Sequence, residues 1–385
     1  MPLGKPSTTD NDMTEDILQR LFHPGVGKEP YYRFQNADGK VWIMPAKHLR
    51  TAMELYQPSG KKGKLLKRWL PLLHKMSIVR KLIRAEQNTY RPDDELQRLL
   101  ERVFHTSGLE LALFCGTPCV HQKMTMQISK GGHILGYCKM TDCDEIATLF
   151  DREGRLLNTL HQKGMTNVPA CLFCGQMTDG TWLFVQSTAK TCASRVVHDW
   201  GMEHDRFLKK LQAATVQHLK FEESDYYHTI EALEKHLQWI PAEVDGDVVR
   251  KAMNDVCRRW TGKEVDFSVC HADFTPWNMF VEKGELFVFD WEYAQQTYPP
   301  MMDQYHFFTQ SALFERHWNT EDIRKYMASD AGGWMDTADY KAYLIEVLAR
   351  FTIREKGHVE GDMARSMKLW SDLLVFLSSE SCFNH

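Results

Sequence analysis

The stretch that decides the fold is His271-Ala-Asp273-Phe-Thr-Pro-Trp-Asn278, followed closely by Phe287-Val-Phe-Asp290-Trp-Glu292. A carboxylate and an amide stand five residues apart after an apolar run, and a second carboxylate ends a predicted hairpin that turns at Lys283-Gly284. Phosphoryl transfer uses such a set, because one carboxylate orients the nucleophile while an amide oxygen and another carboxylate hold Mg²⁺ on a triphosphate. Each residue alone is a common turn cap or strand end, but the ordered set predicts a phosphoryl-transfer site.

The sequence around this stretch has two parts of different character. Between residues 109 and 187, alternating apolar and polar residues predict five strands, and a 3.6-residue period predicts one inserted helix over 143–162. After residue 187 the pattern is mostly helical, with a few short strands near the motif. The sequence therefore predicts an α+β fold, with a five-stranded antiparallel N-lobe and a mostly helical C-lobe. The five predicted strands cover 109–115, 123–128, 134–140, 168–175 and 181–187.

An N-terminal extension precedes the N-lobe. Its first 15 residues are polar and are predicted to form a disordered tail. Alternating residues on either side of Asp38-Gly39 predict a hairpin over 31–44. Helical patterns follow at about 46–56, 62–85 and 93–105. We accordingly expect three parts, namely an extension over 1–107, an N-lobe over 108–187 and a C-lobe over 188–385.

The motif resembles the His-x-Asp-x-x-x-x-Asn motif of the aminoglycoside phosphotransferase and choline kinase group, which is related to the protein kinases. The segment Phe289-Asp290-Trp-Glu-Tyr-Ala resembles that group's second metal motif, and the resemblance extends over residues 108–380. It implies a two-lobed, protein-kinase-like phosphotransferase that uses Mg²⁺ and ATP, with GTP as the alternative nucleotide. It also implies that Asp273 is catalytic and that Asn278 and Asp290 bind the metal.

The N-lobe allows an independent check, since a kinase needs a strand lysine that is held by a helix glutamate. Lys139 lies on the third predicted strand, and Glu153 falls on the apolar face of the following helix, seven residues after Ile146. A carboxylate on a buried face is costly unless it is paired. We therefore predict that Glu153 pairs with Lys139 and that the two position the phosphates of ATP. The alternative is a glutamate that reaches solvent at the edge of the helix.

The other nucleotide contacts follow from position. Gly116 and Thr117 form the turn after the first N-lobe strand, where backbone N–H groups can hold a phosphate. This turn has one glycine where a protein kinase has three. Gln186 lies at the end of the last N-lobe strand, where the chain is expected to meet the adenine edge.

The phosphate acceptor is less well defined by the sequence. We rank a hydroxyl of a sugar or amino sugar first, as in the aminoglycoside phosphotransferases that the motif resembles. Choline or ethanolamine is the alternative, because aromatic residues that could surround a quaternary ammonium stand near the motif, for example Trp277 and Tyr293. A catalytically silent pseudokinase scaffold is the rival from another class.

Composition and charge exclude several other classes of protein. The 385 residues carry a net charge of −4, so no global positive field indicates nucleic-acid binding. No apolar run is long enough to span a bilayer and no secretory signal is visible, so we expect a cytoplasmic protein. Residues 61–84 are a local exception, with nine Lys or Arg residues and no acidic residue. They predict either a weak contact with an anionic membrane or glycan, or a helical pair that packs on the N-lobe with solvated lysines.

Overall fold

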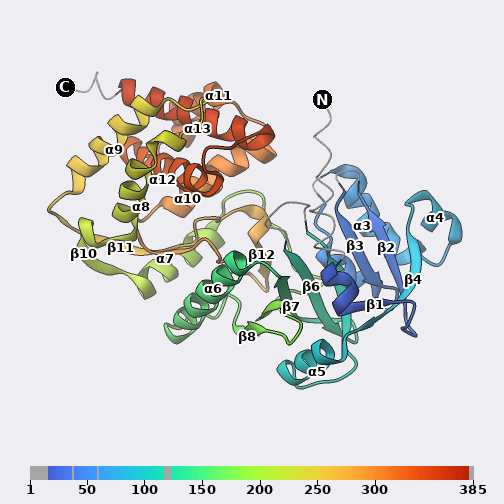
Figure 1. Ribbon diagram of the computed structural model, residues 1–385. Coiled ribbons are helices and arrows are strands. Elements are labelled where there is room, and N and C mark those ends of the chain that lie inside the picture. Colours follow the sequence, from blue (N-terminus) through green and yellow to red (C-terminus); the bar gives the residue numbers. More distant parts are fainter. Residues whose placement is uncertain (1–15, 37–38, 59, 117–122, 381–385) are drawn as a thin grey trace. The chain divides into compact units, whose positions relative to one another are not determined.

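The computed structural model describes residues 16–36, 39–58, 60–116 and 123–380, so the predicted tail over 1–15 lies outside the described residues. The chain forms two compact units. Unit 1 consists of Met1–Gln162, Thr166–Arg195 and Val281–Phe287, and unit 2 consists of Lys163–Met165, Val196–Phe280 and Val288–His385. Strands dominate the first unit and helices dominate the second (Figure 1), which confirms the predicted α+β class.

Unit 1 is built on a nine-stranded antiparallel sheet in the order β1-β4-β2-β3-β5-β6-β7-β9-β8 (Figure 1). The strands are β1 (Phe22–Pro24), β2 (Pro30–Gln35), β3 (Val41–Pro45), β4 (Glu86–Pro92), β5 (Glu110–Phe114), β6 (Met124–Lys130), β7 (His133–Thr141), β8 (Cys171–Gln176) and β9 (Trp182–Ser187). The five predicted strands are present as β5 to β9. The prediction of a five-stranded sheet is nevertheless wrong, because four strands that precede residue 107 continue the same sheet.

The junction of β3 with β5 explains this difference. The edge of β5 would otherwise leave a row of backbone N–H and C=O groups without partners. Here β3 covers that edge, with Trp42 opposite Phe114 and Ile43 opposite Leu113. The rings of Trp42 and Phe114 also stack at a centroid distance of 5.1 Å. The first part of the chain therefore completes the sheet of the N-lobe. The predicted hairpin is confirmed as β2 and β3, which pair from Tyr31 opposite Pro45 to Gln35 opposite Val41.

The basic segment of unit 1 forms two short helices, α3 (Lys61–Leu73) and α4 (Ser77–Leu82), which follow α2 (Leu49–Ala52) and η1 (Met53–Leu55). Pro71 does not end α3, which runs two residues beyond it. Pro71 lies in the last turn, so few backbone bonds remain to be lost, and the amide of His74 still bonds to Leu70 O at 2.8 Å. The break follows His74, whose carbonyl accepts a hydrogen bond from Arg80 Nη1 at 2.7 Å.

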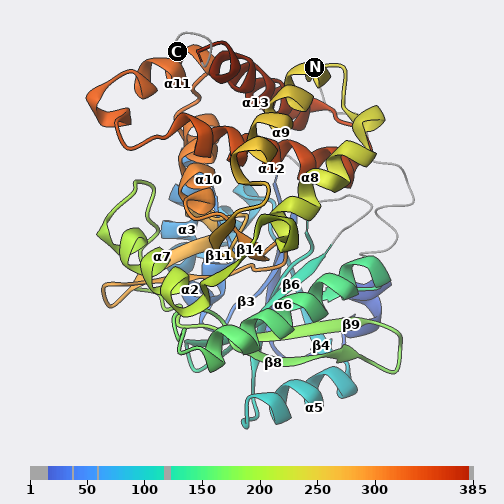
Figure 2. The same cartoon turned by 90° about the vertical axis from the view of Figure 1, so that its left-hand side faces the viewer.

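Unit 1 also contains two longer helices. Helix α5 (Asp94–Val103) begins at Asp93, whose carboxylate accepts hydrogen bonds from two backbone amides of the first turn. Helix α6 (Asp144–Gln162) packs on β7, β8 and β9 (Figure 2). Its predicted apolar face is buried at Ile146, Phe150, Leu157 and Leu160. This face turns Glu153 toward the sheet.

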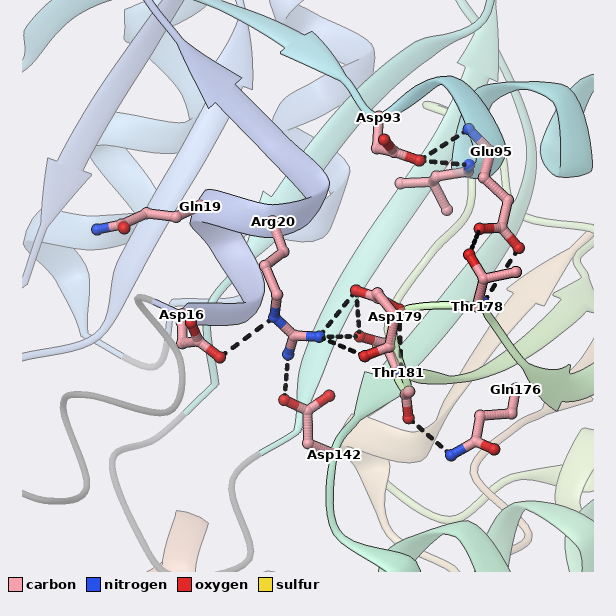
Figure 3. A network of polar contacts seen from close by, with 12 residues as sticks. Asp16, Gln19, Arg20, Asp93, Glu95, Asp142, Gln176, Thr178, Asp179 and Thr181 are labelled. Atoms are coloured by element: carbon pink, nitrogen blue, oxygen red, sulfur yellow. Dashed lines mark hydrogen bonds and ion pairs between the residues drawn. The ribbon is translucent and has the colours of Figure 1, made fainter.

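A further helical segment, residues 16–21, is held to unit 1 by Arg20 (Figure 3). The guanidinium of Arg20 donates to Asp179 Oδ2 at 2.8 Å and to Thr181 Oγ1 at 3.1 Å. It also pairs with Asp142, just before α6, and with Asp16 at 3.2 Å. One arginine thus joins the N-terminal helix, the β8–β9 turn and the start of α6.

Unit 2 is mostly helical, as predicted. Its α- and π-helices are α7 (Met202–Thr215), α8 (Asp225–Lys235), α9 (Gly246–Trp260), α10 (Met302–Gln310), the π-helix η5 (Ser311–Glu315), α11 (Thr320–Met327), α12 (Thr337–Glu355) and α13 (Gly361–Glu380). Four short 3₁₀ segments connect them, namely η2 (Phe221–Glu223), η3 (Leu237–Trp239), η4 (Pro276–Asn278) and η6 (Asp330–Gly332). Helix α12 is buried along most of its length and forms the centre of the core. None of the helices in the described ranges is both long and apolar enough to cross a membrane.

The strands around the motif form two small sheets. One is the three-stranded sheet of β10 (Gln217–Lys220), β11 (Glu264–Cys270) and β14 (Gln295–Tyr298). The other is the predicted hairpin, made of β12 (Met279–Glu282) and β13 (Glu285–Val288). Both residues of its turn have positive φ, 52° at Lys283 and 84° at Gly284. Such turns match the twist of the paired strands, and so this local sequence brings the ends of the hairpin together.

Candidate active site

The loop that follows β11 carries the motif, and His271 and Asp303 give it its shape. The carboxylate of Asp303 accepts hydrogen bonds from the amides of His271 (2.8 Å) and Ala272 (3.0 Å). This holds Ala272 in the left-handed region, at φ 63°. The amide of Asp273 donates to His271 Nδ1 at 3.2 Å, so the proton of this imidazole is on Nε2 and is donated to Phe289 O at 3.0 Å. The buried imidazole therefore connects the motif loop to the segment that carries Asp290.

Asp273 lies at the centre of this loop and receives hydrogen bonds from two side chains. Asn278 Nδ2 donates to Asp273 Oδ2 at 2.7 Å, and His306 Nε2 lies 3.2 Å from Asp273 Oδ1. Burial alone would raise the pKa of Asp273, but the hydrogen bond from His306 and the charge of Arg350 outweigh it, and the pKa is lowered. Asp273 is therefore a carboxylate at neutral pH. In this form it can accept a hydrogen bond from a hydroxyl nucleophile.

His306 is a site residue that the sequence interpretation missed. It comes from α10, 33 residues after Asp273, and is almost fully buried. Burial lowers the pKa of His306, which favours the neutral ring. Tyr343 OH lies 3.3 Å from His306 Nδ1, so the tyrosine donates to Nδ1 and leaves the proton on Nε2 for Asp273. Since a lone histidine in an aromatic segment is common in cores, the sequence carries no signal for this contact.

A second missed contact comes from α12. Arg350 Nη1 donates to the carbonyl oxygen of Ala272, directly before Asp273. Its guanidinium also forms an ion pair with Glu346 at 3.2 Å. Burial raises the pKa of Glu346 to about 7 despite the attraction of Arg350. A buried arginine with a carbonyl and a carboxylate as partners is well placed to hold the loop backbone.

The residues predicted to bind the metal lie on neighbouring strand ends. Asn278 and Asp290 flank the β12–β13 hairpin, where the amide of Phe289 donates to Asn278 O at 3.0 Å. Asp290 has a φ of 70°, a left-handed conformation that a non-glycine residue adopts at some energetic cost and that is common at functional sites. Carboxylate oxygens of Asp290 and Glu292 lie within 4.8 Å of each other. Two carboxylates and an amide oxygen are the hard donors that Mg²⁺ prefers, so these residues fit a divalent cation.

The predicted lysine and glutamate are paired in unit 1. Lys139 of β7 and Glu153 of α6 form an ion pair with Nζ and Oε2 2.7 Å apart. Glu153 is fully buried and Lys139 is 8% exposed. Lys139 Nζ also lies 5.7 Å from the centre of the Phe184 ring on β9. The predicted contact is therefore confirmed, while its role in holding phosphates stays a prediction.

The remaining nucleotide residues were predicted from position. Gly116 follows β5 with a φ of 75°, which only glycine adopts at little cost and which fits a tight turn. Thr117 lies outside the described residues. Gln186 is buried within β9, opposite Tyr137 of β7 and Cys171 of β8. The contacts of Gly116, Thr117 and Gln186 with a nucleotide stay predictions.

Unit 2 also contains a cavity of about 260 Å³ beside α10. It is lined by five aromatic and three polar side chains, namely Trp200, Phe307, Phe308, Tyr326, Trp334, Gln304, Ser311 and Arg316. Ser311 lies in the π-helix η5, and its buried Oγ has no hydrogen-bond partner among the described residues. Local π-helices are frequent at functional sites, and an unpaired buried hydroxyl gives the cavity a polar anchor.

Comparisons with known proteins identify the family and the fold of the chain. A family model described as the phosphotransferase enzyme family matches residues 119–335. One similar solved structure is a thermostable mutant of aminoglycoside phosphotransferase APH(4)-Ia in complex with ADP and hygromycin B. Its alignment covers 74% of this chain and 99% of the phosphotransferase chain, at 12% sequence identity and a TM-score of 0.50. A second variant of this phosphotransferase, in complex with AMP-PNP and hygromycin B, has the same coverage and TM-score at 13% identity. Choline kinase LicA from Streptococcus pneumoniae is 16% identical in sequence. Its alignment covers 66% of this chain and 89% of the choline kinase chain, at a TM-score of 0.42.

The three kinds of comparison carry different weight. A comparison with curated protein sequences found no significant match. The structural similarities at 12% and 13% identity concern the fold alone, and they confirm the predicted kinase-like fold. The family match spans more than half of the chain, at positions that include Lys139, Asp273 and Asp290. The chain therefore belongs to the phosphotransferase enzyme family and is a phosphotransferase with an alcohol group as acceptor.

Proposed function

We propose that this protein is a small-molecule kinase that transfers the γ-phosphate of ATP to a hydroxyl of a sugar or amino sugar, with GTP as the alternative donor. The observation that carries the proposal is the environment of Asp273. Its carboxylate is kept ionised, is oriented by Asn278 and His306, and belongs to a loop that is bonded to the segment of Asp290. A carboxylate held in this way is suited to orient a hydroxyl for attack on a phosphoryl group.

The roles of the other residues follow from their chemistry. Because Asn278 Nδ2 donates to Asp273, Oδ1 is the atom with which Asn278 would bind Mg²⁺, together with Asp290. The metal would neutralise the charge of the triphosphate. Lys139, oriented by Glu153, would pair with the phosphates. Gly116, Thr117 and Gln186 would contact the nucleotide, within a nucleotide-binding lobe over 108–187 that follows an extension over 1–107 and precedes a catalytic lobe over 188–385.

The aromatic cavity beside α10 supports a neutral sugar acceptor. Aromatic faces pack against the C–H faces of sugars, while Gln304 and Ser311 offer hydrogen bonds to hydroxyls. The same aromatic lining is the specific observation in favour of choline or ethanolamine, since aromatic rings bind ammonium groups. Arg316 in the lining disfavours a cation there. We therefore keep the sugar first and the amino alcohol as the alternative.

An assay of nucleoside diphosphate release tests the proposal. ADP release is measured with purified protein, Mg²⁺-ATP and a panel of sugars, aminoglycosides, choline and ethanolamine. The same panel is then measured with GTP as the phosphate donor. A sugar or aminoglycoside is expected to stimulate release, and Asp273→Ala and Asp290→Ala are expected to abolish it while keeping the far-ultraviolet circular dichroism spectrum. Stimulation by choline alone would move the acceptor to the alternative. Full turnover by Asp290→Ala would falsify the assigned metal site.

The pseudokinase alternative is tested by ligand binding. Mg²⁺-ATP is expected to raise the melting temperature of the wild-type protein, because a ligand that binds the folded state stabilises it. Asp290→Ala should show a smaller shift. A protein that shows neither a shift at millimolar nucleotide nor ADP release with any acceptor would be a scaffold.

A further inference from the structure

The basic segment 61–84 has a surface that the proposed phosphotransferase reaction does not use. Thirteen large apolar side chains are exposed among the described residues, and five of them fall between residues 65 and 78. They are Leu65 (59% exposed), Trp69 (45%), Leu72 (71%), Met76 (52%) and Ile78 (70%). No other stretch of similar length in the described ranges concentrates exposed apolar side chains in this way.

Helix α3 has two separate apolar faces. Leu70 is buried and Leu66 is partly buried in the small core that includes Trp42 and Tyr56. One face of α3 therefore packs against the rest of unit 1, which is one of the two arrangements that the sequence predicted for this segment. At about 100° per residue, Leu65, Trp69 and Leu72 fall within about 60° of one another on a second face. This second face is exposed. Packing against the rest of unit 1 therefore accounts for only some of the apolar residues of this helix.

Positive charges surround the exposed apolar face. Lys61, Lys62, Lys64 and Arg68 are exposed on α3, and the guanidinium of Arg68 lies 5.6 Å from the centre of the Trp69 ring. Lys75, Lys81 and Arg84 add exposed charges along α4 and its flanks. The segment contains no acidic residue. Among the described residues, Lys67 is the only lysine of the segment in an ion pair, with Lys67 Nζ and Glu54 Oε2 2.9 Å apart.

We propose that α3 and α4 (Figure 1) bind the surface of an anionic lipid bilayer. In this arrangement the headgroups surround the exposed apolar side chains Leu65, Trp69, Leu72, Met76 and Ile78, and the lysines and arginines contact acidic lipids. The charge of the segment requires an anionic partner. The exposed apolar face requires an apolar phase, which a polyanionic glycan or a nucleic acid does not offer. Of these three partners, only an anionic bilayer supplies both. The surface would hold the kinase beside acceptors that are carried on a membrane.

Vesicle co-sedimentation with the full-length protein tests this proposal. Vesicles of phosphatidylcholine with roughly one third phosphatidylglycerol are compared with vesicles of phosphatidylcholine alone. The wild-type protein is expected to bind the anionic vesicles and to be released by high salt. Lys61→Gln/Lys62→Gln/Lys64→Gln is expected to weaken the partition coefficient about 100-fold, from about 1 kcal/mol per charge near the membrane. Leu72→Ser/Ile78→Ser is expected to weaken it roughly tenfold or more.

Matched controls carry the same substitutions elsewhere. Met202→Ser/Val375→Ser removes two exposed apolar side chains, and Lys209→Gln/Lys210→Gln/Lys235→Gln removes three exposed lysines, all in unit 2. Both controls should bind within about twofold of the wild type, since they leave the charges at the membrane unchanged. Circular dichroism and melting curves check that every variant is folded.

Three outcomes would overturn the proposal. The first is no binding of the wild-type protein to anionic vesicles at low salt. The second is equal weakening by the control variants. The third is a Leu72→Ser/Ile78→Ser variant that binds anionic vesicles as strongly as the wild-type protein does and that also binds heparin as strongly as it binds vesicles. This result would assign the surface to a soluble polyanion. Because the assay needs neither nucleotide nor acceptor, its result is independent of the proposed kinase reaction.

Discussion

His306 Nε2 lies 3.2 Å from Asp273 Oδ1, and this contact joins helix α10 to the acidic residue of the motif loop. It is one of the reasons why the pKa of Asp273 is lowered in spite of burial. His306 is itself kept neutral by burial and accepts a hydrogen bond from Tyr343. We regard it as a positioning residue, because it acts through Asp273.

We predict that His306→Ala moves the acidic limb of the pH profile of kcat/KM to higher pH. A carboxylate with a lowered pKa loses its charge as the pH falls through that value, so raising the pKa shifts the loss upward. A hydrogen bond to a charged group contributes about 1.5–3 kcal/mol, which corresponds to a shift of about one to two pH units. His306→Gln, whose amide can donate in the same way, should restore most of the profile. Tyr340→Phe, which removes a buried hydroxyl of α12 that bonds to Thr309, is the control for a disturbed core, and an equal shift in that variant would contradict the assigned role.

A second prediction concerns the buried pair of Lys139 and Glu153. Lys139→Met leaves Glu153 buried without its charge partner, which typically costs about 3–5 kcal/mol. We expect a fall in melting temperature of roughly 10 °C. The double variant Lys139→Met/Glu153→Leu should recover much of this loss, since replacing both members of a buried ion pair is often neutral. Both variants should lack turnover. Recovered stability with recovered activity would show that the pair is structural only.

A third prediction concerns Asp303. Asp303→Ala removes the acceptor of the His271 and Ala272 amides and leaves two buried donors unpaired, at about 1–3 kcal/mol each. We expect a lower melting temperature and a large loss of kcat with a smaller change in the KM for ATP, because the affected loop carries Asp273. Asp303→Asn keeps one acceptor oxygen and should be intermediate. A loss of kcat in Asp303→Asn as large as in Asp303→Ala, without any loss of stability, would indicate a direct chemical role.

The fourth prediction concerns the contacts of Arg20 (Figure 3). Arg20→Ala removes its bonds to Asp179, Thr181 and Asp142 at once, and we expect a loss of stability of about 1–2 kcal/mol. Hydrogen exchange should accelerate in residues 16–21 and in the β8–β9 turn. The neighbouring Gln19 is exposed, so Gln19→Ala is the matched control. Unchanged exchange in both segments after Arg20→Ala would show that other contacts hold the N-terminal helix.

The sequence by itself determined the parts of this protein that depend on near neighbours in the chain. The motif loop, the turn at Lys283-Gly284 and the approach of Asn278 to the segment of Asp290 all lie within a 20-residue stretch. The pairing of Lys139 with Glu153 also followed from the sequence. A helical period shows which residues of α6 face the sheet, and a buried carboxylate requires a cation.

Tertiary structure alone decided the size of the sheet and the surroundings of Asp273. The sheet grew from five to nine strands because β3 covers an edge of β5, and strand patterns do not specify which distant edge a strand covers. His306 and Arg350 reach the motif loop from helices 33 and 78 residues away, through hydrogen bonds whose geometry exists only once those helices are packed. Local patterns predict which face of an element is buried, whereas the partners on that face depend on how distant elements pack together.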